Sequence, residues 1–206
     1  MKINNRDKIF DVSVDLFSKY GYDAVSIRRI AGEVGIKESS IYNHYKCKES
    51  ILDAILEYYI SKMTSDEIPL SKAAENLDVG IDFFYNTGLE LYKSKLCEPQ
   101  MMKITRIILV EAYHNEKIRD FVKNAMIAGP INGWMDLFDL MKMKGLIRKD
   151  SDSRHLAESF YYYGLFLMIE HFIVNYPEDD GVFLERLGEK SQLQMELIFN
   201  SVREIK

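Results

Sequence analysis

The spacing of apolar residues constrains the fold more than any other feature of this chain. Along most of its 206 residues, they recur at intervals of three and four, which is the pattern of helices with one buried face. We find no convincing run with the alternation expected of a half-buried strand. The sequence therefore predicts an all-α fold.

The first fifty residues predict a compact head of three helices. A first helix over about residues 6–20 is stopped by Gly21, and Ser26 then stands where the N-cap of a second helix belongs. Gly35 ends that second helix, and a third helix over about residues 38–45 follows after a tight turn. Two short helices joined in this way form a helix-turn-helix.

The rest of the chain predicts a larger C-terminal helical bundle. A fourth helix begins near Lys48 and ends or kinks at Pro69, and a kink is also expected at Gly129-Pro130. Counted with the head, nine or ten helices are expected, in two domains of residues 1–47 and 48–206. The remaining predicted helices cover about residues 71–95, 100–113, 115–144, 153–175 and 181–204, with breaks at Glu98-Pro99, at 145–153 and at 176–181.

Composition and charge indicate an ordinary globular protein with an anionic partner for its head. The chain is 47% hydrophobic and 29% charged, and its two cysteines lack metal-ligand spacing, which is typical of a reducing cytosol. Residues 1–50 hold nine Lys/Arg and seven Asp/Glu, although the net charge is −5. The N-terminus has no apolar signal region, and the apolar stretch 160–174 is too short to span a bilayer. We expect a cytoplasmic protein without a membrane segment.

Several short stretches of the head carry a resemblance to a known family. They are Arg6-Asp-Lys-Ile-Phe, Leu16-Phe-Ser-Lys-Tyr-Gly21, Val25-Ser-Ile-Arg-Arg-Ile-Ala31, Val34-Gly-Ile36, Ser39-Ser-Ile-Tyr-Asn-His-Tyr45 and Lys48-Glu-Ser-Ile-Leu52. In order and spacing these stretches resemble the first four helices of the TetR/AcrR family of bacterial transcriptional regulators. Gly145-Leu-Ile-Arg-Lys-Asp150 resembles a loop between later helices of that family.

The resemblance implies that the third helix reads DNA and that its neighbours hold the phosphate backbone. Ile41 and Tyr45 are expected to pack inward. Lys37 and Ser39 depart from the family pattern: the first replaces a capping serine, and the second replaces a glycine or alanine. The candidate DNA-binding residues are Ser26, Arg28, Lys37, Ser39, Ser40, Tyr42, Asn43, His44 and Lys48.

For the bundle, the resemblance implies a ligand cavity, and the helical pattern suggests a dimer interface on the last two helices. Each aromatic or methionine side chain there has the alternative interpretation of ordinary helical core. Acidic groups in the cavity would favour a cationic or hydrogen-bond-donating ligand. The candidate pocket residues are Phe84, Glu90, Met102, Glu111, His114, Trp134, Phe138, Tyr162, Phe166 and Glu170; the candidate interface residues are Leu156, Phe160, Tyr163, Leu167, Leu184, Leu187, Leu197 and Ile198.

Chemistry other than DNA binding finds little support in the sequence. Glu111 and His114 have the Glu-x-x-His spacing of carboxylate-bridged dimetal sites, but such sites need a second pair. No metal, cofactor or catalytic motif is found, so we expect no enzyme.

The sequence therefore predicts a dimeric regulator, most consistent with a repressor that binds a palindromic operator and is released by a small-molecule effector. The alternative is a protein of this fold without an inducer. Such a protein would be controlled by a protein partner or act as a nucleoid or division factor.

Overall fold

The computed structural model describes residues 4–65, 68–98 and 100–203. Over these residues the prediction of an all-α fold is confirmed, with ten helices when the unbroken run over residues 116–143 is counted as one helix and the π-helical segment 170–174 is counted with the α-helix before it. Within the same residues, β-pairing is limited to a single bridge between Ile147 and Arg203. Pro99 and residue 204, where a predicted break and a predicted helix end fall, lie outside the described residues.

The chain divides into two compact units that are not simply consecutive in sequence. Unit 1 comprises the described residues within 1–66 and 94–119, and unit 2 those within 67–93 and 120–206. The domain boundary predicted between residues 47 and 48 thus falls inside unit 1, because a helix from the middle of the chain packs with the head.

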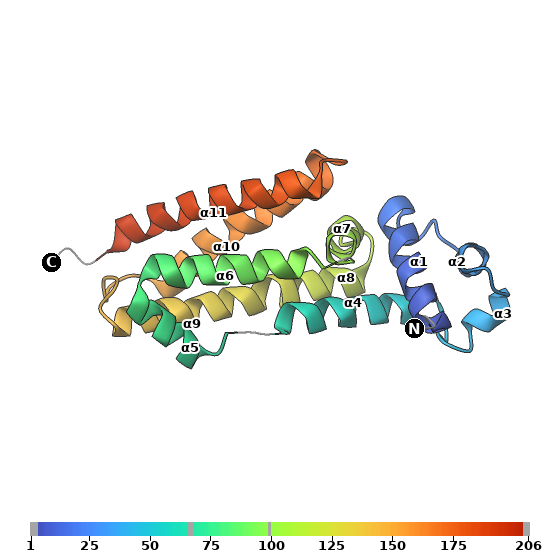
Figure 1. Ribbon diagram of the computed structural model, residues 1–206, viewed down its shortest axis with the longest axis horizontal. Helices are drawn as coiled ribbons and strands as arrows, with labels where there is room; N and C mark the ends of the chain where they lie inside the picture. Colours follow the sequence, from blue (N-terminus) through green and yellow to red (C-terminus); the bar gives the residue numbers. More distant parts are fainter. Residues whose placement is uncertain (1–3, 66–67, 99, 204–206) are drawn as a thin grey trace. The chain divides into compact units, whose positions relative to one another are not determined.

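Unit 1 is built around α1, which contacts α2, α4 and α7 (Figure 1). Its centre is a cluster of fully buried aliphatic and aromatic side chains, including Ile9, Phe17, Ile30 and Ile51. The end of α6 and the beginning of α8 also belong to it. Its helices are α1 (Asn5–Tyr20), α2 (Ile27–Val34), α3 (Glu38–Ile41), α4 (Lys48–Thr64), α6 (Ile81–Leu96), α7 (Met101–Glu111) and α8 (Glu116–Phe121).

The bounds of the first two helices follow from local capping, as predicted. The Asn4 side chain accepts a hydrogen bond from the Arg6 N–H at the start of α1, and the Ser26 side chain caps α2. Gly21 ends α1 with φ 82°, and Gly35 ends α2 with φ 79°. Both values lie in the region that favours glycine, which explains why the chain stops at these two positions.

Ion pairs also join α7 and α8 to the earlier helices of unit 1. Lys103 of α7 lies 2.5 Å from the carboxylate of Asp15 in α1, and Lys117 of α8 pairs with Asp53 in α4. These pairs are largely exposed, so each contributes at most about 1 kcal/mol. They help to set the register of α7 against α1.

Unit 2 packs α9 against α5 and α10, and α10 against α11; α10 and α11 run side by side (Figure 1). Its core is rich in aromatic residues: the rings of Trp134 and Phe160 lie 4.3 Å apart, and Phe138 packs near both Trp134 and Phe199. Its elements are α5 (Leu70–Val79), most of α6, a π-helical segment η1 (Val122–Ala128), α9 (Gly129–Met143), α10 (Ser153–Ile169), a second π-helical segment η2 (Glu170–Val174) and α11 (Asp180–Val202).

The single helix predicted over residues 71–95 is wrong, because the chain forms α5 and α6 with Gly80 between them. Gly80 has φ 153°, and its N–H donates to the carbonyl of Asn76, which closes α5. A conformation that few residues other than glycine adopt ends one helix, and a new helix begins at once.

The irregularity predicted at Gly129-Pro130 is present as the π-helical segment η1, which runs directly into α9. Pro130 has no N–H to donate to the carbonyl of Met126, one turn earlier. The buried hydroxyl of Tyr161 in α10 donates to that carbonyl instead. A proline therefore leaves an acceptor open, and a side chain from the neighbouring helix satisfies it.

A charged cluster joins η2 to α11 at one end of unit 2. Arg186 donates two hydrogen bonds to Glu178, at 2.6 and 2.7 Å. The buried ring of His171 has Glu178 within 2.9 Å of Nδ1 and Asp180 within 3.0 Å of Nε2, and it stacks on Phe183. The hydrogen bonds from Arg186 and then from His171 lower the pKa of Glu178 from 4.5 to about 2.

Among the described residues, no helix combines the length and the apolar character needed to cross a bilayer.

Candidate nucleic-acid interface

The third helix and the turn that follows it place polar groups on the outside and apolar groups on the inside. Ile41 is fully buried and Tyr45 is 5% exposed, so both pack inward as predicted. Between them, Tyr42 is 50% exposed and Asn43 is also exposed. Ser39 is exposed, whereas Ser40 and His44 are half-buried. The exposed polar side chains therefore form a short ridge, which the buried side chains of Ile41 and Tyr45 hold against the rest of the head.

The third helix is shorter than predicted, because α3 ends at Ile41 rather than at Tyr45. Helical curvature nevertheless continues, since the N–H groups of His44 and Tyr45 both donate to the carbonyl of Ile41, at 2.9 and 3.0 Å. Lys37 occupies the N-cap position without a side-chain hydrogen bond to the helix, in agreement with the predicted loss of a cap. An uncapped helix of this length depends on the packing of Ile41 and Tyr45.

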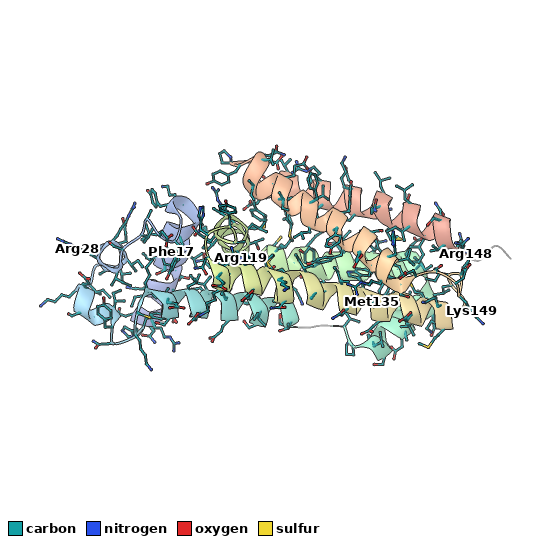
Figure 2. The ribbon with its side chains drawn as sticks, turned by 180° about the vertical axis from the view of Figure 1, so that it is seen from behind. Phe17, Arg28, Arg119, Met135, Arg148 and Lys149 are labelled. Atoms are coloured by element: carbon teal, nitrogen blue, oxygen red, sulfur yellow. The ribbon has the colours of Figure 1, made fainter. Side chains whose placement is uncertain are left out.

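The flanking candidates lie on exposed parts of the head. The Ser26 hydroxyl accepts the N–H of Arg29 at 3.2 Å, so it caps α2 and retains its own proton as a donor. Arg28 is exposed and points outward from α2, whereas Phe17 points into unit 1 (Figure 2). Lys37 is exposed at the entry to α3.

Lys48, at the start of α4, is half-buried against the rest of the head. Its ammonium lies 4.1 Å from the centre of the Tyr22 ring and donates to the Asp23 carbonyl at 3.5 Å. Burial lowers the pKa of Lys48, while the carboxylates of Asp23 and Glu111 act in the opposite direction. The side chain is therefore held by groups that the sequence pattern did not identify.

Glu111 has a structural contact that the sequence did not predict. It is 7% exposed, and its Oε1 accepts the backbone N–H of Tyr22 at 2.7 Å. Beside this contact, a hollow of about 240 Å³ opens between the end of α1 and α7, and Glu111 lines it. The partners are 89 positions apart in sequence, so the glycine that ends α1 is the only local signal of this contact.

Two further residues of the head were not among the predicted candidates. Arg29 stacks over the ring of Tyr20, with its guanidinium carbon 3.8 Å from the ring centre. Lys46 is exposed in the turn after α3. The positive charge of Lys46, next to the predicted DNA-reading helix, could have identified it from the sequence alone.

The candidate pocket residues do not come together as one group. Met102, Glu111 and His114 belong to unit 1, and the others to unit 2. Within unit 2, Phe84, Trp134 and Phe138 contribute to the core. Tyr162 and Phe166 are exposed, whereas Glu90 pairs with Lys93 and Glu170 with Arg186.

The candidate interface residues also divide between surface and interior. Leu167, Leu187 and Ile198 are each at most 8% exposed within the single chain. Leu156, Phe160, Tyr163 and Leu184 are half-buried, and Leu197 is 67% exposed. The apolar side chains that α10 and α11 expose most are Tyr162, Phe166, Val182, Leu193 and Leu197.

The sequence of the head is similar to a family of known proteins. Residues 9–55 match the family model described as bacterial regulatory proteins, tetR family. The HTH-type transcriptional regulator YerO of Bacillus subtilis is 42% identical over 55 residues, which cover 27% of this chain and 19% of YerO. The negative transcriptional regulator IcaR of the icaADBC biofilm operon of Staphylococcus aureus is 44% identical over 48 residues, covering 23% and 26%. The chain thus spans less than a third of the length of these curated relatives.

The whole chain shares its fold with solved structures of low sequence identity. A TetR family transcriptional regulator from Pseudomonas syringae is 12% identical, with a TM-score of 0.65 and both chains covered completely. The relatives named here are all regulators of transcription. Residues 9–55 are thus similar to the TetR family of bacterial regulatory proteins, and the whole chain shares the fold of a solved TetR family regulator.

Proposed function

We propose that the protein binds operator DNA through the face formed by α3, the turn after it and the starts of α2 and α4. The observation that carries this proposal is the division within α3 and its turn, where Ile41 and Tyr45 are buried and Ser39, Tyr42 and Asn43 are exposed. Polar side chains of this kind read base edges and grip phosphates when a helix enters the major groove. The nine predicted contact residues keep this role in the proposal.

The test is fluorescence anisotropy with duplexes that tile the DNA upstream of the protein's own gene. Specific binding should weaken steeply with salt, because each phosphate contact releases counterions. Lys37→Ala should weaken binding and reduce the salt dependence, whereas Lys72→Ala, which removes the same charge from unit 2, should do neither. Failure to bind any upstream duplex at low salt would overturn the proposal.

We further propose that the protein acts as a dimer and pairs through α10 and α11. Tyr162, Phe166, Leu193 and Leu197 are 47–67% exposed in the single chain, and an apolar face of this kind favours burial against a second copy. A dimer would present two heads to a palindromic site. Leu197 is the predicted interface residue that is exposed enough to contribute directly.

Light scattering after size exclusion tests the pairing. The wild-type protein should have the mass of a dimer at micromolar concentration, and Phe166→Glu should have the mass of a monomer. Val79→Glu provides a matched control, because Val79 is 70% exposed on α5 of the same unit and should leave the mass unchanged. A wild-type monomer would contradict the proposed interface.

We also propose that the protein represses transcription and that a small molecule releases it from DNA. Repression is supported by the name of IcaR, a negative regulator, and a ligand site by the aromatic groups of unit 2 around Trp134, Phe138 and Phe160. A ligand would release DNA only if it bound the DNA-free state more tightly. Because the operator that it would bind is chromosomal DNA, we expect the protein to be cytoplasmic.

A thermal-shift screen with cationic, aromatic and lipidic compounds separates this proposal from the alternative. Reproducible stabilisation by a compound that also weakens DNA binding supports an effector. A protein controlled by a partner, or acting as a nucleoid or division factor, would give no such compound.

A further inference from the structure

The buried carboxylate of Glu111 holds the loop that follows α1. Its Oε1 accepts the N–H of Tyr22 at 2.7 Å, a charge-assisted hydrogen bond in a site that is nearly closed to water. The two groups belong to the same compact unit but come from α7 and from the chain directly after α1. A contact of this kind fixes one point of the loop relative to α7.

The loop is shaped to let this carboxylate approach. Gly21 has φ 82°, and a Cβ added there would lie 3.1 Å from Oε1 of Glu111. Glycine thus serves two purposes at this position: it ends α1, and it leaves the space that the carboxylate uses. The Gly21 N–H donates to the Phe17 carbonyl at 2.9 Å, which fixes the loop on its other side.

The side chain of Tyr22 carries this constraint to the candidate DNA-binding surface. Its ring packs against Phe17 at 5.2 Å, and the ammonium of Lys48 lies 4.1 Å from its centre. Lys48 also donates to the carbonyl of Asp23, the next residue of the loop. Two of the groups that contact the ammonium, the Tyr22 ring and the Asp23 carbonyl, therefore belong to the segment that Glu111 fixes, while the Phe17 ring of α1 lies farther away, at 6.0 Å.

We propose that Glu111 is a positioning residue for DNA binding, which acts through Tyr22 to place the ammonium of Lys48 for a phosphate contact. This inference rests on the proposed function, because it needs Lys48 to contact DNA. It adds a residue of α7, outside the helix-turn-helix, to the determinants of that contact. The negative charge of Glu111 also partly offsets the cost of burying Lys48.

The test compares the salt dependence of DNA binding among single variants of the full-length protein. The probe is the upstream duplex bound by wild type, or a duplex selected by wild type from a random pool. Lys48→Ala should lower the slope of log K against log salt by about 0.9 for each phosphate interaction that the change removes from a subunit. Glu111→Met, which retains bulk but has no acceptor, should lower the slope equally. Glu111→Gln retains an acceptor oxygen and should keep the wild-type slope.

The double variant of Lys48→Ala and Glu111→Met should have the slope of Lys48→Ala alone, because both changes remove the same phosphate interaction. A merely structural role would weaken binding at every salt concentration without changing the slope. If Glu111→Met does not fold by circular dichroism, Glu111→Asp replaces it. That variant keeps the charge but shortens the reach by one methylene, and it too should have a lower slope than wild type.

The outcomes separate the two proposals. A wild-type protein that binds no duplex overturns the proposed function and the inference with it. An unchanged slope in Lys48→Ala overturns the role of Lys48 and likewise the inference. A lower slope in Lys48→Ala with a wild-type slope in Glu111→Met, or in its Asp replacement, overturns the inference alone.

Discussion

The adjacent residues Ile41 and Tyr42 should respond to truncation in opposite ways. Ile41 is fully buried, so Ile41→Ala removes three carbon atoms from the core of the head. At about 0.8 kcal/mol per buried methylene, the transfer term alone is about 2.4 kcal/mol. The cavity left behind raises the expected loss of unfolding free energy to about 3–4 kcal/mol. Tyr42 is 50% exposed, and Tyr42→Ala should cost less than about 1 kcal/mol.

Two assays on the same pair of variants measure this division. Urea unfolding followed by far-ultraviolet circular dichroism gives the free energy of unfolding, and fluorescence anisotropy gives the affinity for the upstream duplex. Tyr42→Ala should retain stability and lose affinity, whereas Ile41→Ala should lose stability first. If Tyr42→Ala were the more destabilising change, the assignment of inner and outer faces on α3 would be refuted.

Three further changes test other parts of the fold. The carboxylate of Glu178 has a pKa lowered to about 2 in the folded chain, so its contribution to stability is present above pH 4.5 and lost as pH falls from 4.5 to 2. In Glu178→Gln the midpoint of unfolding should therefore change less with pH across that window. Gly35→Ala should destabilise by about 1 kcal/mol because φ is 79° there, whereas Gly32→Ala, with open space around its Cβ, should stabilise by about 0.5–1 kcal/mol in thermal unfolding. Tyr161→Phe should cost about 1–2 kcal/mol in urea unfolding, since it leaves the carbonyl of Met126 without its side-chain donor; Tyr162→Phe, at an exposed position, should cost almost nothing.

The parts of the fold that could be predicted from sequence are those that depend on local signals. Ser26 and Gly35 mark the bounds of α2 because a cap and a left-handed turn act within a few residues. Gly80 is a signal of the same kind, but isolated glycines also occur inside helices, so its role as a break was missed. The end of α3 could not be placed, since Ile41 and Tyr45 keep helical spacing on either side of it.

The contact between Glu111 and Tyr22 illustrates what local patterns cannot reveal. Its donor is a backbone N–H, which every residue except proline carries, and its acceptor lies 89 positions away. The sequence nevertheless drew attention to Glu111, as an acidic group next to an apolar run, and assigned it to a ligand pocket. A buried carboxylate requires a hydrogen-bonding or charged partner, and the backbone N–H of Tyr22, in the loop after α1, is such a partner for Glu111.

The proposed pairing surface was difficult to predict for a different reason. The α10 helix carries apolar residues around most of its circumference, so periodicity alone does not say which side faces the core and which faces a partner. Packing against α9 and α11 makes that choice, burying Leu167 and exposing Tyr162 and Phe166. The exposed pair, assigned from sequence to a ligand pocket, is better placed for contact with a second copy. Because α10 is apolar on both sides, its sequence does not distinguish the face that packs in the core from the face that we propose pairs with a second copy.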